Sequence, residues 1–368
     1  MSRLAEEPDI INLANVLGLD DAADPMLAIL DSCRKRIDRW ATEAGGITSI
    51  DRLERLVARK LQIVFEEIRT EEDFDRIKAK YATGKWDGIF ASMRMRFEDE
   101  KNPTYGALVC RKNVDDDAPD RYVAVIDCRG DKFFRRFFTR WHEIAHRLTT
   151  HADLDEPVFR SEHDPVEKMM DEIAAHVGFY EPIFVPAFRA AFEGKLLLTF
   201  DTVEAIISGS FPTASFQATL FVCARRLTTP VVYLEATLAH KKEVKRRLQT
   251  PSLFGDEPPP GELRAVKVIP NTAARQERFS IPTMMRVPAE SVIYRLFGAD
   301  PQTDGDGAEN LSQWKSNGKT LERRAVVVEG RKVSDRVIAI VQPVEALNEN
   351  RARIQGQPLF SDGEERPA

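Results

Sequence analysis

Hydrophobic residues in the first third of the chain change their spacing several times, and each change predicts a new element. Apolar positions recur every three or four residues over 1–45 and 50–61, which predicts helices. Residues 61–68 alternate as a half-buried strand does, and Thr70 is a suitable N-cap for a helix over 71–81. The same alternation predicts three further strands, at 88–97, 105–110 and 122–128.

Longer helical patterns follow these strands. Residues 132–151 are predicted to form one helix, and Pro165 is placed to begin a second helix over 166–179. Pro182 and Pro186 are expected to end that stretch, because proline is poorly tolerated inside helices. Three further helices are predicted within 187–228, and the last two follow a helix, turn, helix pattern over 202–208, 209–212 and 213–227.

The C-terminal part of the chain is rich in predicted strands. A short strand is expected at 231–234, and the Pro-rich residues 248–260 are expected to be a linker. The polar residues after 346 are expected to be disordered. Four more strands are predicted, at 263–269, 283–287, 324–328 and 337–341.

Composition and charge describe a soluble protein of a reducing cytoplasm. Of the 368 residues, 43% are hydrophobic and 30% charged, and the net charge of −6 argues against a broad nucleic-acid-binding surface. The four cysteines are scattered, so neither a disulfide framework nor a cysteine zinc site is expected. We find no apolar signal core at the N-terminus and no run of about 20 apolar residues that would predict a membrane span.

The strongest chemical signal is the run His142-Glu143-Ile144-Ala145-His146. Histidines at i and i+4 project from one face of a helix, so their ring nitrogens can reach a single ion. Glu143 would be the general base for an attacking water rather than a ligand. Aromatic and aliphatic residues surround the motif, and polar groups in so apolar a helix would be costly without a purpose. We therefore predict a metal site.

A catalytic zinc site requires a third protein ligand and one open position. His151, His163 and Glu167 are the candidates, and His151 lies off the face that carries His142 and His146. Glu167 begins the predicted second helix, and Asp171 follows it at i+4 on the same face. Glu167 is the preferred ligand. Asp171 would accept the free N–H of a ligand histidine and so fix its tautomer.

These residues resemble the signatures of the ImmA/IrrE metallopeptidases. The resemblance is carried by residues 138–146 and by Glu167-Lys168-Met169-Met170-Asp171 with Ala174-Ala175, and it continues through 181–184. It places Glu167 on the family's third ligand and Asp171 on its Asn/Asp position. The chain departs from the family pattern at Ala145, where glycine is usual, and at Gly178-Phe179-Tyr180, where Leu-Met-Pro is usual. The departures indicate a distant branch.

The resemblance implies an α+β fold in which a zincin-like domain, with a mixed sheet and the metal helix, is followed by helical and small α/β parts. The GAF-like C-terminal part would sense a small-molecule or protein effector. The expected division is an N-terminal helical extension 1–49, a zinc metallopeptidase-like domain 50–186, a helix-turn-helix-like region 187–247, a linker 248–260, a GAF-like domain 261–345 and a tail 346–368.

The resemblance also implies a function, namely a cytoplasmic metallo-endopeptidase that cleaves a helix-turn-helix transcriptional repressor and thereby derepresses stress-response or mobile-element genes. Zinc is the expected metal, although manganese or iron could occupy a His2Glu site. Two other functions stay open: a metal-binding regulator that works without proteolysis, as a sensor, antitoxin-like partner or DNA-associated factor, and a metallohydrolase of small molecules. The presence of Glu143 favours an enzyme over a non-catalytic regulator, because a structural metal site needs no general base.

Other residues and segments could also contribute to catalysis or to binding of a partner. His163 and Tyr180 are candidate oxyanion donors, whereas His176 lies on the opposite face of its helix from Glu167 and is expected to pack in the interior.

Basic residues near 225–247 could contact DNA, but in an acidic chain a solvated basic edge is the preferred interpretation. Residues 249–256 and 355–362 share a Leu-Phe-centred pattern, which is either coincidence or a docking motif for a partner.

Overall fold

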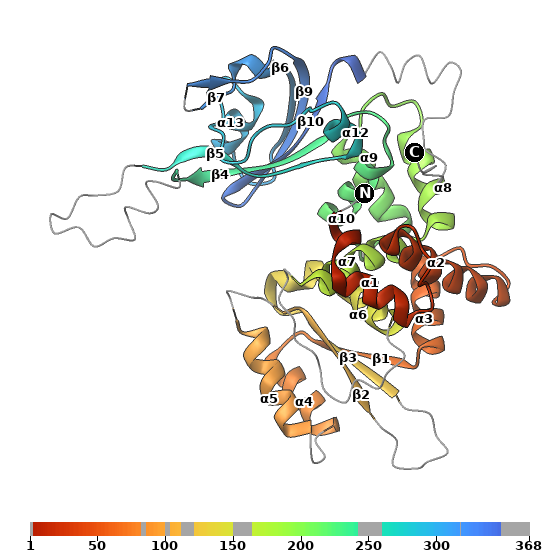
Figure 1. Ribbon diagram of the computed structural model, residues 1–368. Helices are drawn as coiled ribbons and strands as arrows, with labels where there is room; N and C mark the ends of the chain where they lie inside the picture. The colour runs from red at the N-terminus through yellow and green to blue at the C-terminus, as the bar shows by residue number, and fades with distance from the viewer. Residues whose placement is uncertain are drawn as a thin grey trace. The chain divides into compact units, whose positions relative to one another are not determined.

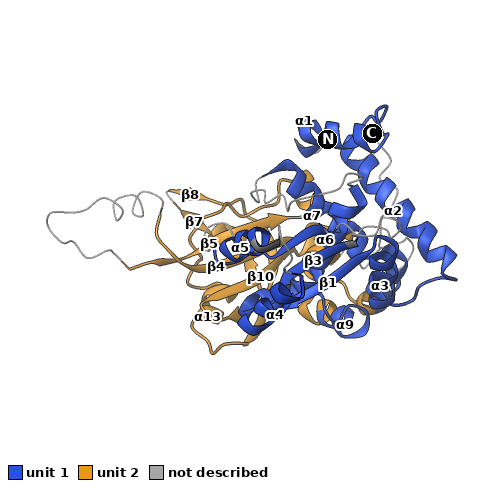
Figure 2. Ribbon diagram, turned by 90° about the horizontal axis from the view of Figure 1, so that it is seen from below, with its two compact units in different colours: residues 1–190, 204–219 blue, residues 191–203, 220–368 orange. Residues whose placement is uncertain are grey.

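The computed structural model describes residues 3–81, 86–99, 104–111, 121–149, 164–241, 260–316 and 318–346 (Figure 1). The chain forms two compact units, which Figure 2 colours separately. Unit 1 contains residues 1–190 and 204–219, and unit 2 contains residues 191–203 and 220–368. The fold class is mixed α and β, as predicted, and none of the helices in the described ranges combines the length and the apolar character that a membrane crossing needs.

Unit 1 is built around a small mixed sheet. Its strand order is β1-β3-β2, in which β1 and β3 run parallel and β2 and β3 antiparallel. The elements of unit 1 are η1 (Arg3–Glu6), α1 (Pro8–Val16), α2 (Pro25–Glu43), α3 (Ile50–Lys60), β1 (Ile63–Ile68), α4 (Glu71–Tyr81), α5 (Trp86–Phe97), β2 (Gly106–Arg111), β3 (Arg121–Asp127), η2 (Gly130–Arg135), α6 (Arg136–Thr149), α7 (Pro165–Gly178) and α8 (Glu181–Phe192). The unit limits fall within α8, α9 (Phe200–Ser210) and α10 (Phe216–Arg226).

Helices cover the two faces of this sheet. Helices α4 and α5 pack on one face, where Phe74, Phe90 and Met93 form a buried cluster with residues of β2 and β3. Helix α6 contacts β2 and β3 and packs against α7, and α1 and α2 in turn contact α7 (Figure 1). The N-terminal helices therefore belong to the same unit as the predicted metal helix instead of forming a separate extension.

Three expectations for unit 1 need correction. The segment 88–97 is not a strand but part of α5, because Phe90, Met93 and Phe97 are buried at helical spacing. The predicted helix over 132–151 begins as the 3-10 helix η2 and continues as α6. Pro182 and Pro186 do not end the helical stretch, since both lie within α8, with Pro182 in the first turn, where proline costs little.

Unit 2 contains a five-stranded antiparallel sheet of order β5-β4-β10-β9-β6. One buried cluster joins residues of β4, β5, β9 and β10 to α12, α13 and Trp314. The elements of unit 2 are β4 (Val232–Ala239), β5 (Glu262–Pro270), α12 (Thr272–Gln276), α13 (Val292–Phe297), β6 (Asp304–Asn310), η3 (Leu311–Gln313), β7 (Lys315–Ser316), β8 (Lys319–Thr320), β9 (Ala325–Val333) and β10 (Arg336–Pro343).

The expected limits of the C-terminal domain differ from this arrangement. Strand β4 lies in the expected helix-turn-helix-like region 187–247, yet it pairs with β5, which follows the expected linker 248–260. The Pro-rich segment thus connects two paired strands of one sheet and does not separate two domains. The predicted strand at 283–287 is reduced to an isolated bridge between Arg264 and Arg286, and β6 was not predicted. Both Leu-Phe-centred segments and the tail from 347 lie outside the described residues.

A single side chain holds together the start of the sheet in unit 2. Asn271 is 7% exposed, and its amide donates to the carbonyl oxygens of Ala224 and Thr229 at 3.0 and 2.9 Å. Its Oδ1 accepts from the backbone N–H groups of Val231 and Ala274 at 3.1 and 2.9 Å. Asn271 thus joins the end of α10, the start of β4 and the first turn of α12.

We expect Asn271→Ala to lower the free energy of unfolding of unit 2 by about 3 kcal/mol, because each buried group left unsatisfied costs roughly 1–3 kcal/mol. Urea unfolding monitored by tryptophan fluorescence would measure the loss. Asn310→Ala, which removes a partly buried cap of η3, is the control and should cost about 1 kcal/mol. Equal losses in both variants would show that Asn271 has no special role.

Candidate metal centre

Helix α6 presents two histidines on one partly exposed stripe and buries its other sides. Phe137, Trp141 and Ile144 are at most 2% exposed, so they fix the rotation of the helix against the sheet and α7. The side chains of His142 and His146 retain 17% and 20% exposure. Their rings lie 4.9 Å apart, as the i and i+4 spacing predicts.

Helix α7 brings the third group. Asp164 caps the helix by accepting from the Val166 N–H at 2.8 Å, and Pro165 occupies its first position. This start places Glu167 in the first turn, opposite the two histidines. At the other end of α7, Gly178 permits close packing, because a Cβ there would lie 2.9 Å from the ring of Trp141. The absence of a side chain at Gly178 therefore accommodates the large Trp141 ring.

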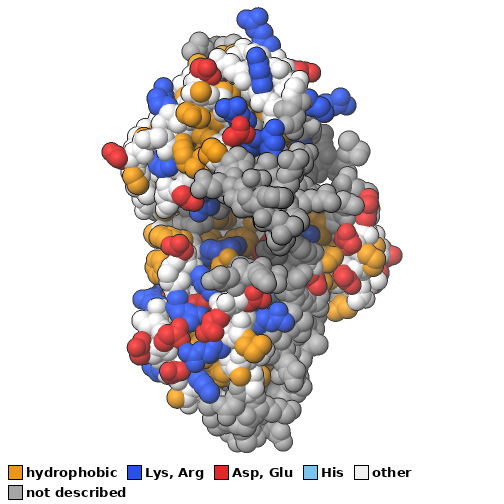
Figure 3. All heavy atoms as spheres, turned by 90° about the vertical axis from the view of Figure 1, so that its left-hand side faces the viewer, with side chains coloured by type: hydrophobic (Ala, Val, Ile, Leu, Met, Phe, Trp, Pro, Cys, Tyr) orange, Lys and Arg blue, Asp and Glu red, His pale blue; other side chains and the backbone are white. Residues whose placement is uncertain are grey.

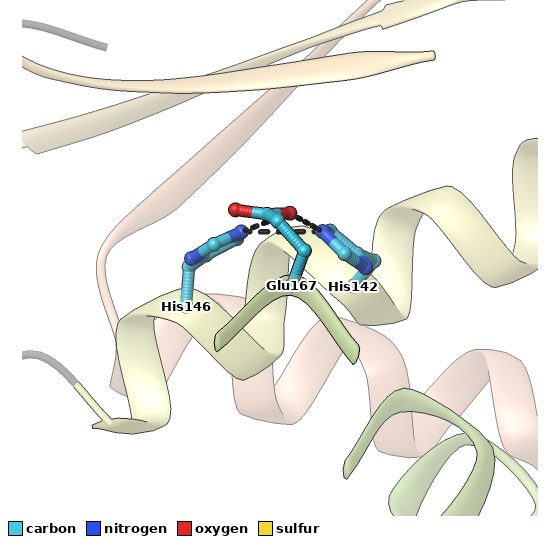
Figure 4. Close-up of side chains that lie close together, drawn as sticks. All are labelled: His142, His146 and Glu167. Carbon is cyan, nitrogen blue, oxygen red and sulfur yellow. Dashed lines mark hydrogen bonds and ion pairs between the residues drawn. The ribbon is translucent and has the colours of Figure 1, made fainter. Parts of the chain in front are cut away.

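The three predicted ligands converge (Figure 4). Nε2 of His142 lies 3.2 Å from Nε2 of His146 and 3.1 Å from Oε2 of Glu167, and Nε2 of His146 lies 3.6 Å from the same oxygen. Ligands about 2.0–2.1 Å from a tetrahedral zinc ion would be separated by about 3.3 Å. The three side chains thus fit one zinc ion, and they form the one group of three such side chains found in the described residues.

Asp171 supports the site from outside. Its Oδ1 lies 2.9 Å from Nδ1 of His142, the ring nitrogen that does not face His146 and Glu167. A carboxylate at Nδ1 keeps the proton on that nitrogen and leaves Nε2 free to act as a ligand. This contact is the one that the sequence predicted for Asp171.

The acidic groups strongly affect the titration of His142. Burial alone would lower its pKa, but hydrogen bonds with Asp171 and Glu167 outweigh burial and raise the pKa to about 10. Burial opposes ionisation of Glu167 as well, yet its hydrogen bonds to His142 and His146 hold its pKa well below the usual range. A metal cation would therefore compete with a proton at His142, so metal binding would release that proton.

Glu143 differs from the three ligands in position and environment. It is 4% exposed, and burial raises the pKa of its carboxyl group despite the nearby histidines. The carboxylate lies against the start of β2. A Cβ added to Gly106 would make hard contact with Oε1 of Glu143 and would lie 2.7 Å from Cγ2 of Thr139. The absence of a side chain at Gly106 thus creates the space that the carboxylate occupies.

The remaining predicted site residues lie elsewhere or outside the described chain. The hydroxyl of Tyr180 donates to Oδ1 of Asp38 at 2.8 Å, so Tyr180 links the connection between α7 and α8 to α2 and does not contact the proposed metal ligands. His176 lies in the last turn of α7, far along the helix from Glu167. His151 and His163, a candidate ligand and a candidate oxyanion donor, lie outside the described residues.

Gly106 and Thr139 are the site residues that sequence reasoning missed. Thr139 lies one helical turn before Glu143, so the stripe of α6 that carries the base could have suggested it. Gly106 offers no such signal, because its role depends on where β2 crosses α6.

Two comparisons with known proteins identify no relative of this chain. No protein-family profile matches the chain. A search of curated proteins likewise returns no match. The resemblance to the ImmA/IrrE metallopeptidases therefore depends on the sequence motifs quoted above alone.

Metal binding can be tested by removing one ligand and one supporting residue. Losing an outer partner of a ligand typically costs 10–100-fold in metal affinity. We expect Asp171→Ala to fall in that range and His146→Ala to exceed it, because His146 would supply a coordinating nitrogen. Competitive titration with a chromophoric zinc chelator would measure both. His176→Ala is the matched control and should bind zinc as the unaltered protein does; an equal loss there would contradict the assignment.

Proposed function

We propose that this protein is a metal-dependent endopeptidase. The observation that carries the proposal is the convergence of His142, His146 and Glu167 together with a buried carboxylate, Glu143, which interacts electrostatically with all three. When bound, zinc lowers the pKa of water and polarises a peptide carbonyl. A purely structural site would have no use for a fourth, non-ligating acidic group in so apolar a place.

Different residues would have different roles in peptide hydrolysis. Glu143 would accept a proton from the attacking water and donate it to the leaving amine, and burial prepares it for this by raising the pKa of its carboxyl group. Asp171 would hold the ring of His142 in one orientation. Trp141 and Gly178 fix the distance between the two helices that supply the ligands.

An extended peptide is the substrate class that the surroundings of Glu143 favour. Strand β2 is an outer strand of its sheet. Because the carbonyl of Tyr105 accepts from the N–H of Asp127, antiparallel alternation directs the main-chain N–H and C=O groups of Gly106 and Leu108 away from β3. A peptide that added to this edge would pass directly beside Glu143. The segment 88–97, which the sequence pattern predicts as a strand, lies in helix α5 and offers no strand edge to a peptide.

A helix-turn-helix repressor remains our proposed protein substrate, and sensing of an effector remains our proposed role for unit 2. Helices α9 and α10 do follow the predicted helix, turn, helix order. On the face shown in Figure 3, however, acidic and basic side chains are interspersed over the described surface, which supports the preference against DNA binding. Because β4 pairs with β5, regulation should not be tested by truncation at residue 261, which would split the sheet.

The proposal is tested by incubating the purified, zinc-loaded protein with a proteome-derived peptide library and identifying new N-termini by mass spectrometry. The same preparation of Glu143→Gln subtracts cleavage by contaminating proteases. Cleavage that depends on Glu143 would support the proposal, and a repressor encoded beside this gene is the first intact substrate to try. Identical products from both proteins, or none from either, would contradict it.

A further inference from the structure

We propose that Arg135, stacked on Tyr105, forms a subsite for a carboxylate side chain of the bound peptide. The inference deepens the proposed function and rests on it, because it names a chemical feature of the substrate. Among the cations that follow β3 along the chain, Arg135 differs from its neighbours in its partner, which is an aromatic ring and not a carboxylate.

The neighbouring cations are all paired with carboxylates. Asp127 accepts from Arg129 and Lys132 at 2.8 and 2.7 Å. Glu67 pairs with Arg136 at 3.4 Å and with Arg140 at 3.1 Å.

Arg135 has no such carboxylate among the residues that the structure places. It is exposed, and its guanidinium lies 3.9 Å from the centre of the Tyr105 ring. Stacking on an aromatic ring orients a guanidinium while leaving its N–H donors available. Arg135 is thus held in place without being neutralised, as a group that recognises an incoming anion must be.

The position of Arg135 relates it to the proposed active site. Tyr105 directly precedes Gly106, the residue whose missing side chain accommodates Glu143. On the helical side, the hydroxyl of Thr139 donates to the carbonyl of Arg135 at 3.1 Å, and Thr139 itself lies against Gly106. Arg135, Thr139 and Glu143 therefore follow one another at four-residue intervals along the side of η2 and α6 that faces the start of β2.

Charge complementarity identifies the occupant. A peptide lying along the β2 edge would pass Gly106 and the Tyr105–Arg135 pair, and an Asp or Glu side chain could form two parallel hydrogen bonds with the guanidinium. Phe133 and Phe134 lie just before Arg135 and are 45% and 66% exposed, with ring centres 6.2 Å apart. The partner is therefore an extended segment with an acidic residue and an apolar residue near it.

Binding and cleavage can be separated in the test. Zinc-loaded Glu143→Gln protein is used to select binders from a random peptide display library, and the selected sequences are compared with those bound by Glu143→Gln/Arg135→Glu. We expect Asp or Glu to be enriched at one fixed position in the first set and Lys or Arg at that position in the second. Arg52→Glu, a charge reversal at an exposed position of helix α3, is the matched control and should select the same acidic position as the parent.

The outcomes distinguish this inference from the proposed function. Selection of peptides without an acidic position, selection unchanged by Arg135→Glu, or no selected peptide would overturn the Arg135 subsite. Cleavage of library peptides by the unaltered protein would still support an endopeptidase in each of these cases. In contrast, Arg135-dependent selection of acidic peptides with no cleavage would support the subsite and contradict the peptidase.

Discussion

Replacing Glu143 by glutamine is expected to leave zinc binding unchanged and to lower peptide cleavage by at least about 100-fold. Glutamine has nearly the same shape as glutamate, so the space beside Gly106 stays filled. It cannot accept a proton, however, and general acid–base groups typically contribute 10²–10⁴-fold to the rate.

The burial of Glu143 makes this substitution informative. A carboxylate that is 4% exposed pays for its desolvation, which is why burial raises the pKa of this group. The neutral amide avoids that cost, so we expect Glu143→Gln to be as stable as the unaltered protein or more stable. A variant that is at least as stable, holds its metal and yet is inactive would identify Glu143 as a functional group rather than a packing one.

Three measurements decide the outcome: bound zinc by atomic absorption, thermal unfolding, and the rate of release of the new N-termini found in the peptide library. Glu172→Gln, an acidic residue of α7 outside the group of ligands, is the matched control and should keep full activity. Full cleavage by Glu143→Gln would rule out Glu143 as the general base. Biological activity that persists without cleavage would favour the non-proteolytic regulator.

Local patterns were sufficient to predict the two helices that carry the proposed metal ligands. The four-residue spacing of His142 and His146, together with Pro165 as a helix start before Glu167, is a property of short segments, and the structure forms both helices. The contact of Asp171 with His142 was also predicted, because Asp171 lies one turn after Glu167. What these patterns could not give is the distance between the helices, which depends on Trp141 packing against Gly178.

Elsewhere the sequence pattern was ambiguous or misleading. Residues 88–97 contain apolar residues at both strand and helix spacing, and burial of Phe90, Met93 and Phe97 on one side decides for the helix. Strand β6, with the sequence Asp-Gly-Asp-Gly-Ala-Glu-Asn, has almost no strand propensity and exists because β9 pairs with it. The Pro-rich segment suggested a domain limit, but pairing of β4 with β5 is a long-range contact that composition does not report.

Among glycine-to-alanine substitutions in unit 1, we expect Gly106→Ala to lower peptide cleavage the most. The backbone of Gly106 lies in a strand and does not have a positive φ, so alanine is compatible with the chain conformation. The added Cβ nevertheless makes hard contact with Oε1 of Glu143 and lies 3.2 Å from its Cδ. Since the carboxylate is enclosed by the sheet and α6, it must move toward the metal ligands or rotate away from them.

We expect this displacement to lower cleavage by about 100-fold, the effect that a misplacement of roughly 1 Å can have on a catalytic group. Zinc affinity should change little, because the three atoms nearest to a Cβ at residue 106 belong to Glu143 and Thr139 and not to a proposed metal ligand. Gly88→Ala is the matched control: a Cβ there meets nothing within 4 Å, and alanine favours helix α5, so cleavage should be unchanged.

A double substitution separates displacement of the base from general damage to the sheet. Glu143→Asp shortens the side chain by one methylene and draws the carboxylate away from residue 106. If Gly106→Ala acts by pushing the carboxylate, its effect on cleavage should be much smaller in the Glu143→Asp background than in the unaltered protein. If the alanine merely loosens the packing of β2, the two losses should multiply and the unfolding temperature should fall in proportion. Coupled losses with unchanged unfolding would therefore show that the start of β2 sets the position of Glu143, and through it the point at which a peptide along that strand is cut.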